Sequence, residues 1–191
     1  MGTQMTEGKR KLHEALLDLR KEMPFSKMTV TGICKRAGVS RYTFYTYFKD
    51  KYDLLGDVCH SAEELLIEDY RRLQAENNPD NRPVASYQNL TTACIDIMFN
   101  HLDLFDLIAG EGNMDVALTY YRLLLKNLDR LESSYATGTS SKYDRRQLNS
   151  FLIMGIASFV SSARAAGESA DAIREDAREL VADLARGGLF G

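Results

Sequence analysis

Apolar residues recur at helical spacing along most of the chain, and the pattern is clearest between residues 28 and 55. Four of them fall at positions i, i+3, i+4 and i+7 and make one stripe of an α-helix: Val30, Ile33, Cys34 and Ala37. Phe44 and Phe48, four residues apart, define the buried side of a second short helix. Between the two helices, Gly38 is able to take the left-handed conformation that ends the first helix, and Ser40 is able to cap the second. The stretch therefore predicts a helix-turn-helix followed by a longer helix.

The second of these helices carries the side chains best suited to recognition. With Phe44 and Phe48 inward, at about 100° per residue, three side chains project away from the core: Tyr42, Thr43 and Thr46. Tyr45 and Tyr47 fall on the flanks, and Arg41 reaches outward on its long stem. This face offers a guanidinium and several hydroxyls but no carboxylate, which suits the grooves of DNA. The alternative is an ordinary three-helix packing unit with half-buried tyrosines, but turn, cap, apolar pattern and cationic face together favour DNA.

The run from Val39 to Lys51, VSRYTFYTYFKDK, resembles the DNA-binding signature of the tetracycline-repressor (TetR) family. The resemblance covers about residues 8–57, under a third of the chain. It implies a helical homodimer that binds a palindromic operator in double-stranded DNA and releases it when a small-molecule effector enters the C-terminal domain. The expected fold is all-α, with about nine helices. Residues 1–50 are expected to form the helix-turn-helix head, and residues 51–191 an effector-binding and dimerisation domain.

The resemblance also assigns roles to single residues of the head. It implies base contacts from one group, with Thr31 as a further candidate: Arg41, Tyr42 and Thr43. It implies phosphate contacts from a second group: Thr29, Tyr45, Tyr47 and Lys51. Asp50 is expected to cap the helix that Lys51 begins. Tyr42 and Thr46 depart from the residues frequent in the family, so the operator sequence does not transfer.

The distribution of charge agrees with a head that approaches phosphates. The net charge is −3, but residues 1–51 hold eleven of the 24 Lys and Arg and only five of the 27 Asp and Glu. The cationic run Lys9–Lys11 opens a helix expected from Glu7 to Met23, where it is unfavourable to the helix dipole unless a phosphate lies nearby. A solvated charged end is the alternative.

The remaining helices are expected from periodicity and from breaks in it. A fourth helix should run from Lys51 to about Glu76, with Leu65 in its apolar stripe, and end at the linker 77–83. The further expectations are a helix over Val84–Ile108 broken near His101, one over Asn113–Tyr135, a loop over Ala136–Ser141, and helices over Tyr143–Ala166 and Ser169–Arg186.

The last two helices suit a four-helix interface between two subunits, since one is rich in small residues and the other is amphipathic. An intramolecular core is the alternative. Dimerisation also follows from the mechanism, because two half-sites about 34–36 Å apart specify a site that one short helix cannot.

An apolar effector cavity is expected in the body, and aromatic, sulfur-bearing and His side chains are the candidates for its lining. They are Tyr70, Cys94, Met98, Phe99, His101, Tyr120, Tyr121 and Phe159. Each of them is also a plausible core residue.

Other chemistries find little support in the sequence. Three separated cysteines fit reduced thiols of a cytoplasmic protein, and the longest apolar stretches, such as Phe151–Val160, are about half of a membrane span of roughly 20 residues. No metal-ligand motif, cofactor-binding loop or catalytic motif is visible, so we expect no metal, no cofactor and no enzyme. Two rival hypotheses stay open: an activator or partner-controlled regulator with the same head, and a helical adaptor that binds protein instead of DNA.

Overall fold

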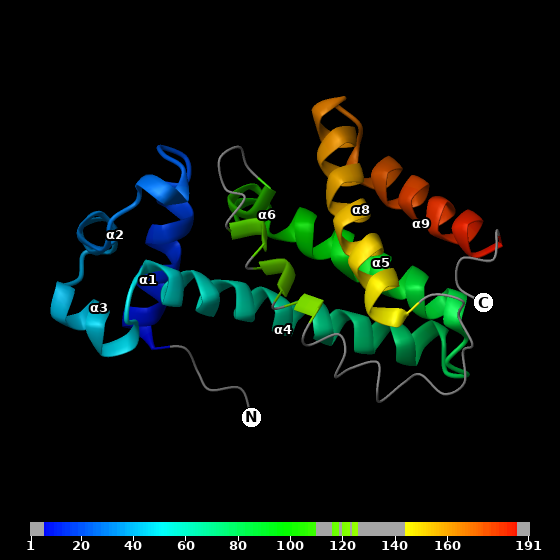
Figure 1. Ribbon diagram of the computed structural model, residues 1–191, viewed down its shortest axis with the longest axis horizontal. Helices are drawn as coiled ribbons and strands as arrows, with labels where there is room; N and C mark the ends of the chain where they lie inside the picture. The colour runs from blue at the N-terminus through cyan, green and yellow to red at the C-terminus, as the bar shows by residue number, and fades with distance from the viewer. Residues whose placement is uncertain (1–5, 110–115, 119, 123, 126–143, 187–191) are drawn as a thin grey trace. The chain divides into compact units, whose positions relative to one another are not determined.

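The computed structural model describes residues 6–109, 116–118, 120–122, 124–125 and 144–186, and every regular element in these ranges is helical (Figure 1). The all-α expectation is therefore confirmed for this part of the chain. The elements are α1 Glu7–Leu19, the 3₁₀ turn η1 Phe25–Lys27, α2 Val30–Ala37, α3 Arg41–Tyr47, α4 Lys51–Asn77, α5 Pro83–Asn100, α6 Leu102–Ala109, α8 Arg145–Ala165 and α9 Ala170–Arg186.

The chain divides into two compact units whose boundaries differ from a simple head and body. The first unit is Met1–Ser61 together with Leu102–Tyr120, and the second is Ala62–His101 together with Tyr121–Gly191. The first unit thus contains the start of α4 and the whole of α6, in addition to the expected head.

The core of the first unit follows the apolar stripes of the sequence. α1 packs against α2 and α3. It buries Leu12, Ala15, Leu16 and Leu19, and the other two helices add Ile33, Cys34 and Phe44. The cap residues take their expected places, because Gly38 has φ 66° and the hydroxyl of Ser40 accepts a hydrogen bond from the amide of Thr43 at 3.0 Å. The helix-turn-helix is thereby confirmed.

The first helix is shorter than expected. α1 ends at Leu19, whereas the sequence predicted a helix as far as Met23. The amides of Lys21 and Glu22 bond to carbonyls three residues back, and that of Met23 bonds to Leu19, so the last residues form a turn. This turn leads into Pro24 and η1.

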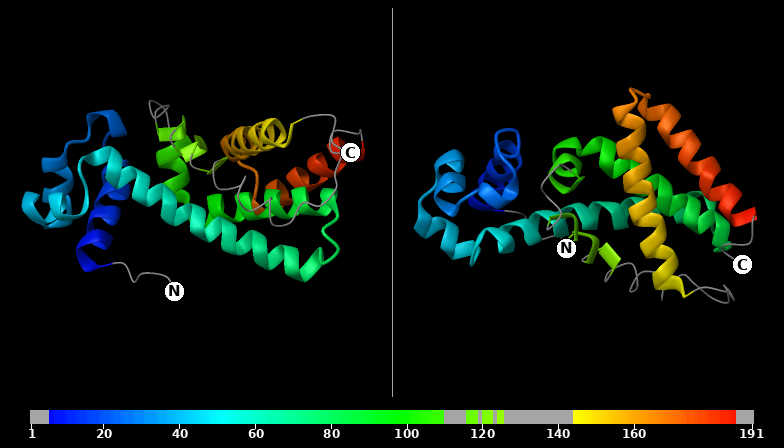
Figure 2. Two further views of the ribbon diagram at one scale, coloured as in Figure 1. Left: turned by 60° about the horizontal axis from the view of Figure 1, so that its bottom comes forward. Right: turned by 45° about the horizontal axis from the view of Figure 1, so that its top comes forward.

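The second unit is built around α5, which packs against both α8 and α9 (Figure 2). At its start, a buried amide cluster joins the end of α4 to α5. Asn89 donates to Gln74 at 2.5 Å, and Asn78 donates to Gln74 at 3.2 Å and to Ser86 at 2.9 Å. The expected linker is thus an ordered corner in which Asn78 is buried.

The predicted helix boundaries at His101 and Ser169 are confirmed, and the predicted burial of Leu65 is wrong. His101 separates α5 from α6, and the Ser169 hydroxyl accepts from the amide of Ala172 at 3.2 Å to cap α9. Leu65, expected in a buried stripe of α4, is 41% exposed. The expected loop 136–141 and most of the expected helix 113–135 lie outside the described residues.

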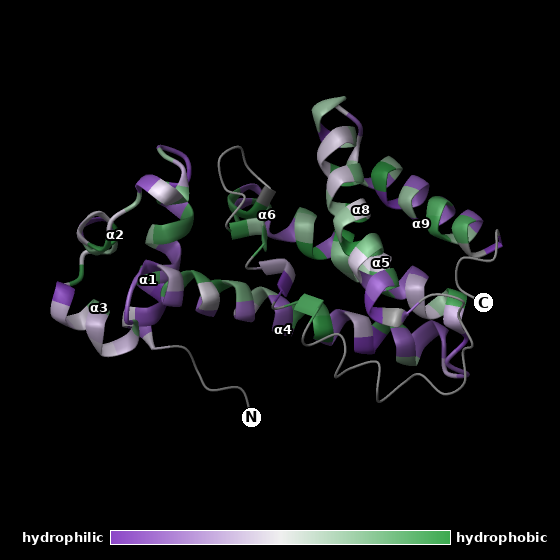
Figure 3. Ribbon diagram, in the orientation of Figure 1, coloured by the Kyte–Doolittle hydropathy of each residue, from purple (hydrophilic) through white to green (hydrophobic). Residues whose placement is uncertain are grey.

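α8 is apolar over a longer stretch than the ten residues Phe151–Val160 that stand out in the sequence. Arg146–Ala165 is, within the described residues, the one segment long and apolar enough to cross a membrane by length and composition alone. Figure 3 shows this hydrophobic character along α8. The core helices of water-soluble proteins have the same composition, and Leu152, Ile156 and Val160 are buried here against the rest of the unit.

Candidate nucleic-acid interface

The third helix is anchored by two rings and exposes its opposite side. Phe44 is fully buried and Phe48 is 3% exposed, and their ring centroids lie 5.8 Å apart. Tyr42 is 84% exposed, and Arg41 and Thr46 are also exposed. The predicted orientation of the helix is therefore confirmed.

The other candidate DNA contacts differ in how exposed their side chains are. Tyr45 is exposed, and Thr43 is half-buried beside the Ser40 hydroxyl at 2.9 Å. Tyr47 is half-buried against the start of α1, where a Cβ added to Gly8 would lie 3.0 Å from its ring. At the start of α2, Thr29 and Thr31 are exposed; the Thr29 hydroxyl also caps α2 by accepting from Gly32 at 3.1 Å.

Arg41 is oriented by a neighbour one turn along the same helix. Its Nη2 donates to the hydroxyl of Tyr45 at 3.4 Å, and its guanidinium carbon lies 5.8 Å from the centre of that ring. The hydrogen bond to Tyr45 raises the pKa of Arg41 above its usual value. The pair presents a cation and an aromatic ring together on the exposed side of α3.

Lys51 has partners that the sequence did not predict. Its ammonium donates to the backbone carbonyls of Phe25 at 2.9 Å, Ser26 at 3.0 Å and Met28 at 3.0 Å. An ammonium has three N–H donors, and these three bonds use all of them. The geometry therefore argues against the phosphate contact that was expected of Lys51.

A charged cluster between α1 and α4 was also not predicted from the sequence. Asp57 on α4 accepts from Lys9 at 2.9 Å and lies 2.8 Å from Nε2 of His13, both on α1. Lys9 is thus half of an ion pair within the fold, whereas the sequence suggested a phosphate or solvent for the run that contains it. The one hint of this cluster in the sequence was the position of His13, which directly follows Leu12 in a helix whose apolar stripe was correctly predicted.

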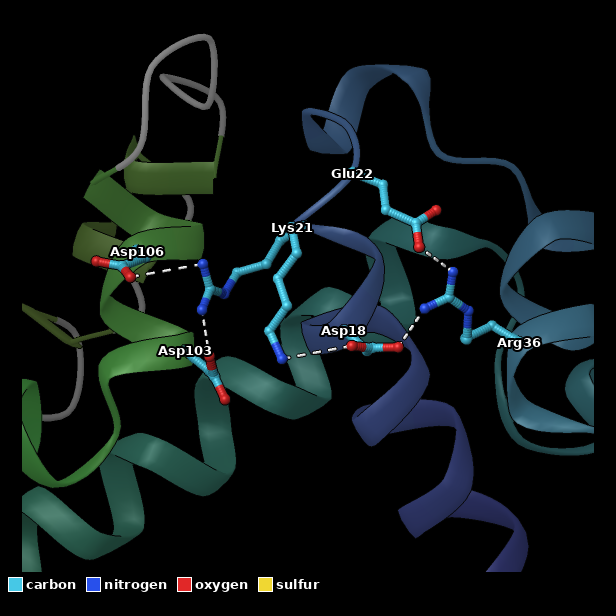
Figure 4. A network of polar contacts seen from close by, with 7 residues as sticks. Asp18, Lys21, Glu22, Arg36, Asp103 and Asp106 are labelled. Atoms are coloured by element: carbon cyan, nitrogen blue, oxygen red, sulfur yellow. Dashed lines mark hydrogen bonds and ion pairs between the residues drawn. The ribbon is translucent and has the colours of Figure 1, made fainter.

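Ion pairs connect the end of α1 with two other helices, α2 and α6 (Figure 4). Arg36 on α2 pairs with both Asp18 and Glu22, and these hydrogen bonds raise the pKa of Arg36. On the other side, Arg20 pairs with Asp103 and Asp106 of α6. The end of α1 thus ties both α2 and α6 into the first unit.

The eight effector candidates do not form one set. Tyr120 belongs to the first unit and the other seven to the second. Tyr70 and Cys94 are buried, and burial raises the pKa of the Cys94 thiol to about 12. The remaining candidates with half-buried side chains in the second unit are Met98, Phe99, Tyr121 and Phe159.

Two candidates have surroundings that do not suit a cavity wall. The ring of Phe99 lies 5.2 Å from the guanidinium carbon of Arg174, which also donates to Asp96 at 2.7 Å. His101 is exposed at the end of α5. Met98, Cys94, Tyr70 and Phe159 are therefore the better candidates for an apolar lining. Within the described residues, no three metal-ligating side chains gather at one point, and the three cysteines are free thiols.

Comparison with known proteins gives one family and one fold. Residues 13–58 match the family described as "Bacterial regulatory proteins, tetR family". No curated protein matches the sequence. A putative TetR-family transcriptional regulator from Syntrophomonas wolfei shares the fold, with a TM-score of 0.77 at 15% identity over 94% of this chain and 95% of that one.

Two regulators named FadR have the same fold. FadR from Bacillus halodurans, a fatty acid degradation regulator, aligns with a TM-score of 0.68 at 17% identity over 94% of this chain and 96% of its own. FadR from Bacillus subtilis, solved in complex with stearoyl-CoA, aligns with a TM-score of 0.62 at 18% identity over 90% and 96%. At these identities the likeness establishes the fold.

Proposed function

Starting from a TetR-family DNA-binding domain at residues 13–58, we propose that this protein is a homodimeric repressor that a small-molecule effector releases from a palindromic operator. It acts in the cytoplasm on double-stranded DNA and catalyses no reaction. The domain supports regulation of transcription, and the exposed side chains of α3, α8 and α9 support operator binding and dimerisation.

The observation that carries the proposal is the exposed side of α3. Tyr42 is 84% exposed although it is a large aromatic residue, and it lies next to the exposed Arg41. Phe44 and Phe48 hold the helix in the core, so the outward side chains are free to enter a groove. Arg41 suits a guanine edge, and Thr43 a base edge or a thymine methyl group. Thr31 is a further candidate for a base edge, and the hydroxyls of Thr29 and Tyr45, with Tyr47 at the flank, suit phosphates and sugars.

The dimer is supported by the exposed side of α8 and α9. Phe151 is 58% exposed and Met154 46%, and they lie one turn apart on α8 beside the exposed Gly155 and Ser158. Leu180 on the adjacent α9 is 45% exposed. Small residues next to large apolar ones allow close approach of another helix, and a second copy of the same pair would cover them.

The effector is proposed to be a molecule with an apolar part that the second unit holds. Tyr70, Cys94, Met98 and Phe159 are sulfur-bearing or aromatic and come from three of its helices. Because FadR from Bacillus subtilis was solved with stearoyl-CoA, a long-chain acyl-CoA is a reasonable first effector to test. Effector and operator would oppose each other through a coupling of about 1–3 kcal/mol.

Selection from a pool of random duplexes tests the proposal. We expect the purified protein to enrich a palindrome and to bind it as a dimer, with affinity that falls steeply as salt rises. Stearoyl-CoA, added over a concentration series, should weaken binding. A strictly monomeric protein that enriches no sequence at low salt would contradict the DNA-binding proposal, and a helical adaptor would show little salt dependence. Failure of stearoyl-CoA alone would reject that effector and leave the DNA proposal intact.

A further inference from the structure

The ammonium of Lys51 is enclosed by backbone oxygens and rings. Besides its three hydrogen bonds of 2.9–3.0 Å to the carbonyls of residues 25, 26 and 28, it lies 4.8 Å from the ring centre of Phe25 and 5.4 Å from that of Tyr52. The two rings meet edge to face, with centroids 5.3 Å apart. Carbonyl oxygens and ring faces are both negative, so the cation is stabilised on every side that these contacts cover.

The three carbonyls belong to the segment that begins the helix-turn-helix. Phe25 and Ser26 are in η1, which lacks a side-chain cap, and Met28 directly precedes Thr29, the N-cap of α2. Phe25 and Met28 are each 2% exposed, so their side chains fix the segment in the core. Lys51 supplies donors to these carbonyls from 23 to 26 residues further along the chain.

Lys51 is also the first residue of α4, directly after α3 and its two aromatic anchors. Asp50 caps α4 by accepting from the amides of Tyr52 at 2.8 Å and Asp53 at 2.9 Å, which fixes the backbone from which the Lys51 side chain departs. One ammonium therefore joins the segment before α2 to the segment after α3. These are the two ends of the helix-turn-helix.

We propose that Lys51 is a positioning residue for DNA recognition, which fixes the helix-turn-helix on the start of α4 and does not bind a phosphate. The inference rests on the proposed DNA-binding function. It distinguishes two kinds of lysine: a phosphate ligand contributes a charge to any duplex, whereas a positioning residue acts on selective binding through the placement of α2 and α3.

Two substitutions at this position separate charge from geometry. Lys51→Arg keeps the charge, but a bulkier, planar guanidinium does not direct three donors to three converging carbonyls. Lys51→Met keeps the apolar stem and removes every donor. Lys49→Gln is the matched control, because Lys49 is exposed and its loss changes the net charge by the same amount as Lys51→Met.

The experiment measures binding to the selected operator and to an unrelated duplex over a salt series, at a temperature where circular dichroism shows each variant folded. We expect Lys51→Arg and Lys51→Met each to lose operator affinity about tenfold or more, with a small change on the unrelated duplex. The slope of log affinity against log salt should stay at the wild-type value. Lys49→Gln should keep the wild-type ratio of operator to unrelated affinity.

Three outcomes would overturn the inference. If Lys51→Arg binds like the wild type and Lys51→Met lowers the salt slope by about one, Lys51 is a phosphate ligand. If both variants melt at lower temperature but the folded proteins keep full operator affinity, the contact is structural only. If the wild type binds no duplex, both the proposed function and the inference about Lys51 fail. The wild-type measurement alone distinguishes this outcome from the other two.

Discussion

Nε2 of His13 on α1 lies 2.8 Å from Oδ2 of Asp57 on α4, in a contact where the imidazole is largely buried. Burial is the strongest influence on the ring and lowers the pKa of His13, although the hydrogen bond to Asp57 opposes it. For Asp57, burial raises the pKa, but the hydrogen bonds from Lys9 and His13 outweigh that effect and lower it. The folded protein therefore favours neutral His13 and ionised Asp57.

These directions predict that the protein loses stability in mild acid. In the unfolded chain His13 binds a proton near pH 6.5, whereas in the folded chain it binds one only at lower pH. The contribution of His13 to the free energy of unfolding is therefore fully present above about pH 6.5. It is lost as the pH falls toward the pKa of His13 in the folded chain. The contribution of Asp57 persists to lower pH. It is fully present above about pH 3.8, the pKa of this aspartate in the unfolded chain, and is lost as the pH falls through the lower pKa of Asp57 in the folded chain. The measurement is the urea midpoint of unfolding at a series of pH values from 8 downward.

A variant that cannot titrate isolates the histidine. His13→Gln retains an N–H for Asp57 but has no proton to gain, so its urea midpoint should change less between pH 7.5 and 5.5 than that of the wild type. His101→Gln is the control, because His101 is exposed and its removal should leave the wild-type slope. Equal pH dependence in His13→Gln and the wild type would show that other groups cause the acid effect.

The second prediction concerns Gly155 on the exposed side of α8. A Cβ added there meets no atom within 4 Å in the subunit, so Gly155→Ala should stabilise the helix by about 0.5–1 kcal/mol in a monomer. A bulky side chain would clash only with a partner that approaches closely. We therefore expect Gly155→Leu to remain folded but to sediment as a monomer at concentrations where the wild type is a dimer.

Gly56 on α4 gives the matched control for this experiment. It too is helical with open space around its Cβ, but it lies outside the proposed interface. Gly56→Leu should stay dimeric in analytical ultracentrifugation. If Gly155→Leu also stays dimeric with the wild-type dissociation constant, this side of α8 is not the interface.

The helical architecture was predictable because it depends on local patterns. The spacing of Phe44 and Phe48, and the turn chemistry of Gly38 and Ser40, determine the head through contacts within a few residues. His101 and Ser169 marked real helix boundaries for the same reason. Side-chain orientation on α3 follows directly from helix geometry, so the exposure of Tyr42 and Thr46 was also predicted correctly.

The partners of the charged residues were not predictable, because they depend on segments far apart in the sequence. Lys51 bonds to the carbonyls of residues 25, 26 and 28, and Asp57 bonds to Lys9 and His13. No periodic pattern signals a contact between a lysine and backbone oxygens, and the resemblance to a family suggested a phosphate instead. Leu65 shows the converse limit, since an apolar residue at helical spacing can still lie on the surface.

The third prediction concerns Tyr42 as a determinant of sequence preference. Because its side chain is 84% exposed, Tyr42→Ala should leave the melting temperature nearly unchanged. Loss of a base contact should cost about 1–3 kcal/mol at one position of each half-site and relax the preference there. Selection from random duplexes with both proteins measures this, and Lys49→Gln should lower affinity for all sequences alike if it has any effect. An unchanged preferred sequence for Tyr42→Ala would exclude a role in base recognition.

The last prediction concerns Arg20, whose guanidinium faces two carboxylates of α6. Its side chain is 17% exposed and pairs with Asp103 and, at 3.5 Å, with Asp106. Arg20→Gln would leave these two acids one turn apart without the cation between them, and their repulsion should loosen α6 from α1. We expect amide hydrogen exchange over Leu102–Ala109 to become about five- to thirtyfold faster while α2 stays protected. Because Arg10 pairs with Glu14 on its own helix, Arg10→Gln should leave exchange in α6 at the wild-type rate. Unchanged protection of α6 in Arg20→Gln would mean that apolar packing alone holds this helix in the first unit.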